Sequence, residues 1–142
     1  MAKESNMQEP WRLVTVPLCS DARGMLCFAE WHHLPFVPKR VFWIFGVPEG
    51  AQRGGHSHAT CAEVVFPVRG SFDMTVDTGH ERKTLHMDRP DTGIYIGPNV
   101  WCELSSFAPD TVCVVVASED YDPDGYINDY KKFVESLELR AE

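Results

Sequence analysis

The sequence predicts an all-β barrel followed by one C-terminal α-helix. Short runs rich in β-branched and aromatic residues recur along the chain, separated by turn residues that include many of its ten glycines and ten prolines. Many short strands at regular spacing are typical of a β-sandwich or barrel. Near the C-terminus the apolar spacing changes from that of a strand to that of a helix. A length of 142 residues fits one domain, which we expect to span residues 1–142.

The predicted strands fill most of the chain between a polar N-terminus and the final helix. We expect residues 1–10 to be frayed, because they are polar and terminal. The predicted strands cover residues 12–17, 25–31, 40–47, 62–69, 71–77, 83–87, 93–96, 101–107 and 112–118. Pro67 lies inside one of these runs and has no N–H to donate, so it predicts an edge strand or a bulge at that point.

Five aromatic or apolar residues near the C-terminus recur at the spacing of one helix face: Tyr126, Tyr130, Phe133, Val134 and Leu137. This stripe predicts an α-helix over residues 124–138, with Asp124 as its N-cap. Because only one side of the helix is apolar, we expect it to pack on the outside of the barrel.

The charge distribution excludes some classes of partner. The net charge is −8, and the residues from Glu119 onward supply −5 of it. An acidic chain without a cluster of lysines and arginines is a poor candidate for nucleic-acid binding. A phosphorylated ligand would have to be attracted by local arginines against this net charge.

The cysteines and the hydropathy pattern bear on the compartment. Five cysteines are an odd number, and none stand in C-x-x-C spacing, which favours a reducing compartment over a disulfide framework. No N-terminal apolar segment and no run of 18 apolar residues occurs, so neither secretion nor membrane spanning is supported. We therefore expect a cytoplasmic protein without a membrane partner.

The segment between Gly50 and Gly70 carries a pattern of chemically active residues. His56 and His58 stand in H-x-H spacing, and Glu63 follows at a fixed interval. Alternate residues of a strand share one face, so both imidazoles point the same way. An isolated H-x-H is more often a pair of surface histidines, but the flanking glycines and Glu63 match the first motif of the cupins. The sequence therefore predicts a cupin, which is a double-stranded β-helix or jelly-roll barrel, with both imidazoles facing its interior.

The second cupin motif is incomplete in this chain. Gly93 and Pro98 are present, but no histidine follows them, and Cys102 or Glu103 stands where the last metal ligand would be sought. A catalytic metal usually keeps at least three protein ligands. One set of residues could still supply them in the manner of a facial triad: His56, His58 and Glu63.

Further short motifs follow one another in a single order from Asp21 to Phe133. They are Asp21-Ala22-Arg23-Gly24, Leu34-Pro35-Phe36, Lys39-Arg40-Val41, Arg53-Gly54-Gly55-His56-Ser57-His58, Gly70-Ser71-Phe72, Gly93-Ile94-Tyr95-Ile96, Pro98 with Trp101, Ala117-Ser118, Tyr121-Asp122, Tyr126-Ile127 and Asp129-Tyr130. In these motifs the chain resembles the cupin-type nucleotide-sugar 3,4-ketoisomerases, the WxcM-like family.

The resemblance implies an isomerase that acts on dTDP-4-keto-6-deoxyglucose as a homodimer, without a metal or other cofactor. It implies that His56 and His58 handle the protons and that Arg40 contacts the substrate. It also implies a place in deoxysugar biosynthesis, such as that of lipopolysaccharide or O-antigen.

The residues fit this chemistry. Moving a ketone from C4 to C3 of a hexose requires removal of the C3 proton, an enediol, and return of a proton at C4. A neutral imidazole with a pKa of about 6.5 suits this task at cellular pH. We expect His56 to be the principal base and His58 to be the second acid/base or the partner of the developing oxyanion.

Four further residues are candidate substrate contacts. Arg40 and Arg53 could bind the diphosphate, because a guanidinium matches phosphate oxygens bidentately, although either could instead form an ordinary surface ion pair. Tyr95 and Trp101 could line the pocket or stack on the thymine, and barrel core is the alternative for both.

The chain departs from the usual family pattern at three places. It has Glu63 where glutamine is usual, Cys102 where histidine is usual, and Phe42-Trp43 where a tyrosine is common. Glu63 would strengthen a metal site, and Cys102 removes one proton carrier. The sequence shows no base that would activate Cys102 as a nucleophile.

Two other functions remain open at this point. One is a metal-dependent cupin of the oxygenase type, with Fe(II) or another divalent metal on His56, His58 and Glu63. The other is a cupin that binds a nucleotide sugar without turnover. A 3,5-epimerase is a nearer variant of the isomerase.

Overall fold

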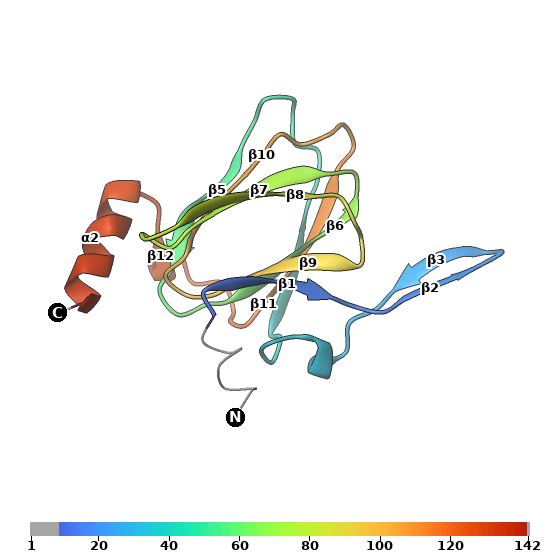
Figure 1. Cartoon of the computed structure of the whole chain (residues 1–142), viewed down its shortest axis with the longest axis horizontal. Helices are drawn as coiled ribbons and strands as arrows, with labels where there is room; N and C mark the ends of the chain where they lie inside the picture. The colour runs from blue at the N-terminus through green and yellow to red at the C-terminus, as the bar shows by residue number, and fades with distance from the viewer. Residues whose placement is uncertain (1–8, 142) are drawn as a thin grey trace.

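Two five-stranded antiparallel sheets face each other in the computed structural model, which describes residues 9–141 (Figure 1). The first sheet has the order β1 (Trp11–Thr15), β9 (Thr92–Ile96), β6 (Glu63–Arg69), β11 (Val112–Ala117) and β4 (Arg40–Ile44). The second has the order β12 (Tyr126–Ile127), β5 (Arg53–His58), β10 (Trp101–Ser105), β7 (Phe72–Asp77) and β8 (Arg82–Met87). The predicted all-β barrel is thereby confirmed; the expectation of a frayed terminus falls, for residues 1–8, outside the described residues.

A separate hairpin of β2 (Leu18–Asp21) and β3 (Gly24–Cys27) projects from the body of the molecule (Figure 1). The strand predicted at 25–31 ends at Cys27, and a 3₁₀ turn, η1, covers Trp31–His33. The hairpin forms because Asp21 accepts a hydrogen bond from the Arg23 amide (2.8 Å), and Gly24 has a positive φ of 128°.

The main core lies between the two sheets. Strand β11 alternates inward and outward, and its inward residues Cys113 and Val115 meet Phe72 and Met74 of β7. Pro67 stands in β6 inside the first sheet. Pairing of β6 with β9 covers only Glu63, Val64 and Val65, and the register of β11 shifts between Val112 and Cys113, opposite Pro67. The expected bulge at this proline is confirmed.

The C-terminal helix α2 covers Tyr130–Ala141 and ends the chain that the structure describes. The predicted start at Asp124 is wrong. Asp124 lies in a 3₁₀ turn, η2 (Pro123–Gly125), and the chain then pairs with the free edge of β5 as β12 before the helix begins. Asp129 caps the helix instead, since its Oδ1 accepts from the Lys132 amide at 3.1 Å.

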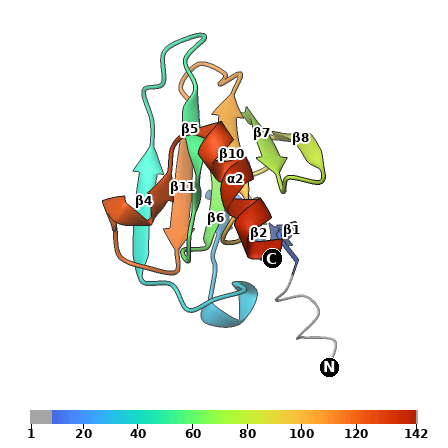
Figure 2. The same cartoon turned by 90° about the vertical axis from the view of Figure 1, so that its left-hand side faces the viewer.

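Helix α2 packs outside the second sheet, as the apolar stripe predicts. In Figure 2 it crosses in front of β5 and β10. Phe133 of the helix is completely buried, and the Tyr130 hydroxyl donates to Asp77 on β7 at 2.7 Å. Of the helices in residues 9–141, none is long and apolar enough to span a membrane.

Candidate active site

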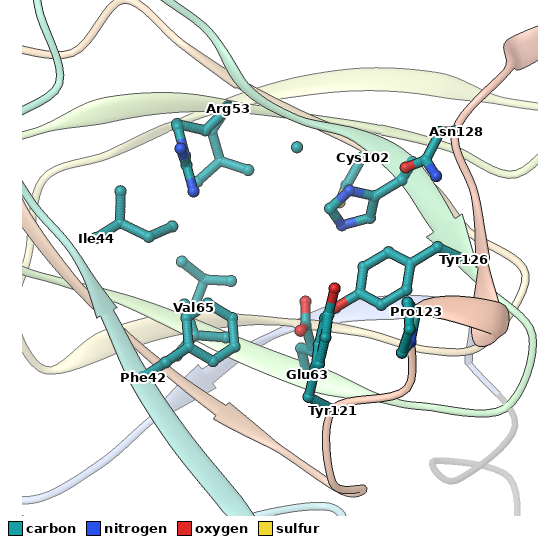
Figure 3. A pocket seen from close by; sticks show the side chains of 14 residues that line it. Phe42, Ile44, Arg53, Glu63, Val65, Cys102, Tyr121, Pro123, Tyr126 and Asn128 are labelled. Atoms are coloured by element: carbon teal, nitrogen blue, oxygen red, sulfur yellow. The ribbon is translucent and has the colours of Figure 1, made fainter.

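A cavity of about 340 Å³ opens between the two sheets (Figure 3). Phe42, Ile44 and Val65 give it an apolar side, and Glu63 lies beside them, between this side and Tyr126. The cavity is thus apolar on one wall and polar on the other, which is the usual character of a small-molecule site.

Two histidines of β5 lie at the polar side, where His56 lines the cavity and His58 is buried next to it. His56 and His58 alternate with buried Ser57, so both imidazoles leave the same face of the strand. Their ring centroids are 4.9 Å apart, and His58 is only 4% exposed. The predicted orientation of the H-x-H pair toward the barrel interior is confirmed.

Gly54 allows β5 to approach β10 closely just before the histidines. Its φ is +78°, and a Cβ at this position would lie 2.9 Å from the carbonyl oxygen of Cys102. The register between the two strands shifts between Cys102 and Glu103. A side chain at position 54 would therefore move the segment that carries both imidazoles.

Tyr126 of β12 closes the site over the histidines. It pairs with His58 across the β12–β5 ladder, and its ring centroid lies 5.0 Å from that of His56 and 4.4 Å from that of His58. Burial raises the pKa of Tyr126, so its phenol stays protonated at neutral pH and can donate a hydrogen bond.

Glu63 of β6 lies on the other side of His58. Its Oε1 is 3.5 Å from His58 Nε2, and its Oε2 is 3.9 Å from a terminal nitrogen of Arg40. The 3.5 Å separation is too long for a good hydrogen bond, and among the described residues His58 Nε2 has no hydrogen-bond partner.

The imidazole of His56 is tuned toward its neutral form. Burial lowers its pKa, and the positive charge that His58 can carry lowers it further. A neutral imidazole has a free nitrogen lone pair, so His56 is available as a base at and below neutral pH.

The two candidate arginines have different positions. Arg53 lines the cavity at the start of β5. Arg40 lies behind Glu63, where its Nε donates to the Glu119 carbonyl at 3.2 Å and its guanidinium covers the ring of Phe42. The structure therefore brings Arg53 to the cavity itself and Arg40 to the layer behind its wall.

Tyr95 and Trp101 are not brought to this cavity. Strand alternation turns Ile94 and Ile96 inward, so Tyr95 packs on the opposite face of the first sheet. Trp101 packs under α2 and donates its Nε1–H to Glu103 at 2.8 Å. Both predicted pocket positions are therefore wrong, and the alternative of barrel core is wrong as well, since the two residues are buried on the outer faces of the two sheets.

Cys102 takes the inward position beside Trp101 and lines the cavity. Burial, together with the nearby carboxylates of Glu63 and Glu103, strongly raises the pKa of its thiol. The thiol is therefore neutral, which disfavours a nucleophilic role as the sequence also indicates.

A comparison with protein families decides the relationship of this chain. The model of the family described as FdtA (WxcM-like, C-terminal) matches residues 9–138. This chain belongs to the WxcM-like FdtA family. The predicted resemblance is confirmed over nearly the whole length.

Several relatives of this chain are named as sugar ketoisomerases. The chain is 36% identical over 126 residues to the TDP-4-oxo-6-deoxy-alpha-D-glucose-3,4-oxoisomerase of Aneurinibacillus thermoaerophilus, which covers 86% of this chain and 91% of the relative. The sugar 3,4-ketoisomerase QdtA of Thermoanaerobacterium thermosaccharolyticum, solved with TDP, is 32% identical, with a TM-score of 0.89 over 94% of this chain and 98% of that one.

A variant of QdtA with asparagine in place of one histidine has been solved with TDP-4-keto-6-deoxyglucose. It is 32% identical to this chain, with a TM-score of 0.88 over 92% of this chain and 96% of that one. These relatives confirm the cupin-type barrel for this FdtA-family chain.

Sequence reasoning missed the C-terminal part of the site in this FdtA-family chain. Tyr121, Tyr126 and Asn128 all line the cavity. Their segment is irregular, and Tyr126 falls by coincidence on the helical stripe that continues through Tyr130. The motif Tyr126-Ile127 was the available signal, because its two residues precede a new cap at Asp129.

Proposed function

We propose that this protein is a TDP-sugar 3,4-ketoisomerase that moves the ketone of TDP-4-keto-6-deoxyglucose from C4 to C3. The observation that carries the proposal is the pair of adjacent imidazoles, His56 and His58, of which His56 lines a cavity between the sheets. Membership of a family whose relatives are named for this isomerisation gives the substrate class. The named relatives are isomerases, so they favour this function over a metal-dependent oxygenase and over a protein that only binds a nucleotide sugar.

In this proposal His56 removes the C3 proton. Its lowered pKa favours the neutral form that a base needs. Loss of the proton gives an enediolate with its negative charge on O4. The proton of the O3 hydroxyl then moves to O4, which places the charge on O3, and a proton returned to C4 leaves a hydroxyl at C4 and a ketone at C3. His58 returns that proton or donates to the oxyanion, since the centroid of its ring lies 4.9 Å from that of His56.

Tyr126 supports the enediolate as a neutral donor. Its ring covers both histidines, and its phenol stays protonated at neutral pH. Donors fixed in advance around a developing oxyanion are among the largest contributions to catalysis. The sugar thus meets bases on one side and a phenol on another.

The two ends of the substrate meet different side chains of the cavity. Arg53 is the diphosphate contact that we propose, because a guanidinium can bind phosphate oxygens bidentately and the chain is otherwise acidic. Phe42, Ile44 and Val65 suit the C6 methyl group of the deoxysugar. Arg40 acts through Glu63 rather than on the phosphates.

The proposed reaction needs no cofactor. One carbon of the sugar is oxidised and its neighbour is reduced, so no external oxidant or reductant takes part. The two imidazoles supply the proton transfers.

We further propose that the protein is a homodimer. Hairpin β2–β3 pairs only with itself in the described chain and exposes Met25 and Leu26, although a lone two-stranded hairpin is marginally stable in water. On β4, Trp43 is also exposed beside Phe45. Sedimentation equilibrium tests this, with about twice the chain mass expected and the chain mass alone contradicting it.

A cytoplasmic setting in deoxysugar biosynthesis, such as that of lipopolysaccharide or O-antigen, completes the proposal. All five cysteines are free, which fits a reducing compartment.

The test of the function is product identification. The purified protein is incubated with TDP-4-keto-6-deoxyglucose, and the product is examined by carbon NMR. A ketone at C3 supports the proposal, and its C4 configuration follows from the proton couplings. Unchanged substrate, or a sugar epimerised at C5 with its ketone still at C4, would contradict it.

A further inference from the structure

Three ligand atoms converge beside the cavity, which His56 and Glu63 line. The ring nitrogens of His56 and His58 and a carboxylate oxygen of Glu63 all lie within 4.8 Å of one another. The side chains of His58 and Glu63 are only 5% and 8% exposed. Within residues 9–141, His58 Nε2 is buried without a hydrogen-bond partner. A buried polar nitrogen is costly unless something binds it.

The chemistry of this set suits a divalent transition metal. Two imidazoles and one carboxylate are the donors that Zn²⁺ and Fe²⁺ accept, with bonds of about 2.0–2.2 Å. Ligands at right angles on such an ion lie about 3 Å apart. The ligand atoms, now within 4.8 Å of one another, would have to approach each other by less than about 2 Å. Rotation about the side-chain torsions of Glu63 and His56 can supply this movement.

The surroundings of Glu63 also favour binding at one of its oxygens. Arg40 lies 3.9 Å from Oε2, while Oε1 faces His58. A charged group on the outer oxygen orients a ligating carboxylate and leaves the inner oxygen free. The cavity beside the three side chains leaves room for further ligands.

We propose that His56, His58 and Glu63 form a site for one divalent transition-metal ion, and that its occupation blocks isomerisation. The second half rests on the proposed function. A nitrogen lone pair that binds a metal cannot also accept the C3 proton, so the two uses of the histidines exclude each other. The site would make the activity sensitive to free Zn²⁺.

The binding test uses the full chain after removal of metals by a chelator. Zn²⁺ is titrated by calorimetry into the native protein, Glu63→Gln and His58→Asn, with circular dichroism to confirm folding. Asp73→Asn is the matched control, because Asp73 and His86 form an exposed carboxylate–histidine pair at 2.8 Å, with no third ligand beside them in residues 9–141. We expect one site per chain that Glu63→Gln weakens at least tenfold and Asp73→Asn leaves unchanged. Native-like binding in both Glu63→Gln and His58→Asn would overturn the site.

A second readout separates this proposal from the proposed function. Zn²⁺ is added to the isomerisation assay, and the concentration for half-inhibition is compared between the native protein and Glu63→Gln. Inhibition that a chelator reverses, with at least tenfold more Zn²⁺ needed for the variant, supports mutual exclusion. Stimulation by Zn²⁺ would overturn it. If the protein proves inactive on the sugar, the calorimetry still decides whether the metal site exists.

Discussion

The rings of Tyr126 and His58 lie against each other with centroids 4.4 Å apart, and their residues are paired across the ladder between β12 and β5. This contact places a segment from the end of the chain directly over the histidine pair. The same segment continues into α2, where Tyr130 donates to Asp77 of β7. The C-terminal segment is thus both a wall of the site and an attachment to the barrel.

Replacement of His56 by asparagine should remove the principal base and leave the fold intact. We expect kcat to fall by about 10²–10⁴-fold, which is the usual contribution of a positioned general base. The matched control is His86→Asn on the exposed strand β8, which should retain native activity. Turnover is followed by proton NMR, and unfolding by circular dichroism. An active His56→Asn variant would remove His56 from the mechanism.

The pH profile should reflect the lowered pKa of His56. Burial and the neighbouring His58 hold that pKa below the ordinary imidazole value, so the base stays neutral as the pH falls through about 6.5. We expect kcat/KM to be flat from pH 8 to 6.5 and to decline only below that range. An acid limb centred above pH 6.5 would contradict the assignment.

The same shift has a consequence for stability. The unfolded chain takes up a proton on this histidine at a higher pH than the folded protein does, so protonation favours unfolding. His56 should therefore lower the free energy of unfolding as the pH falls through and below about 6.5. In His56→Asn this part of the pH dependence should be absent from denaturant titrations.

Removal of the Tyr126 hydroxyl should affect turnover more than binding. Tyr126→Phe keeps the ring contacts with both histidines but loses the donor, and we expect kcat to fall by about 10²-fold with a small change in KM. Tyr121→Phe is the comparison, since Tyr121 also lines the cavity but is 64% exposed. Equal losses in the two variants, or a loss confined to KM, would contradict the donor role.

Two adjacent glycines allow the packing at β5 to be separated from its backbone conformation. Gly54 and Gly55 have similar φ values of +78° and +75°, but only at Gly54 would a Cβ meet other atoms, the nearest at 2.9 Å. Each alanine should cost about 1 kcal/mol for the left-handed backbone. Gly54→Ala should cost at least about 1 kcal/mol more, because overpacking adds to that strain. Thermal unfolding of both variants measures the difference. Equal losses of stability would mean that β10 moves away from the added Cβ at no cost, which would contradict the overpacking.

The sequence predicts the parts of this molecule that depend on local spacing. Alternation in H-x-H puts His56 and His58 on one face, and the structure turns that face inward. The bulge at Pro67 is also a local effect, because it follows from the missing N–H of that one residue. Glu63 lies near them because its spacing from the histidines belongs to the same motif.

The remaining parts depend on long-range pairing, which spacing does not encode. Tyr126 satisfies a helical pattern, yet the free edge of β5 binds it as a strand. The face that Tyr95 and Trp101 present depends on the register with neighbouring strands, which a single residue shift would reverse. The position of Arg40 behind Glu63 likewise depends on β4 pairing with β11 at the far side of the sheet.

Isomerisation in D₂O tests the central claim most directly. The chelator-treated protein is mixed with TDP-4-keto-6-deoxyglucose, and the hydrogens at C3 and C4 are followed by proton NMR. Proton transfer through His56 and His58 predicts loss of the C3 proton and a 3-keto product that carries deuterium at C4. A product that retains the original C3 hydrogen at C4, or the absence of any 3-keto product, would contradict it.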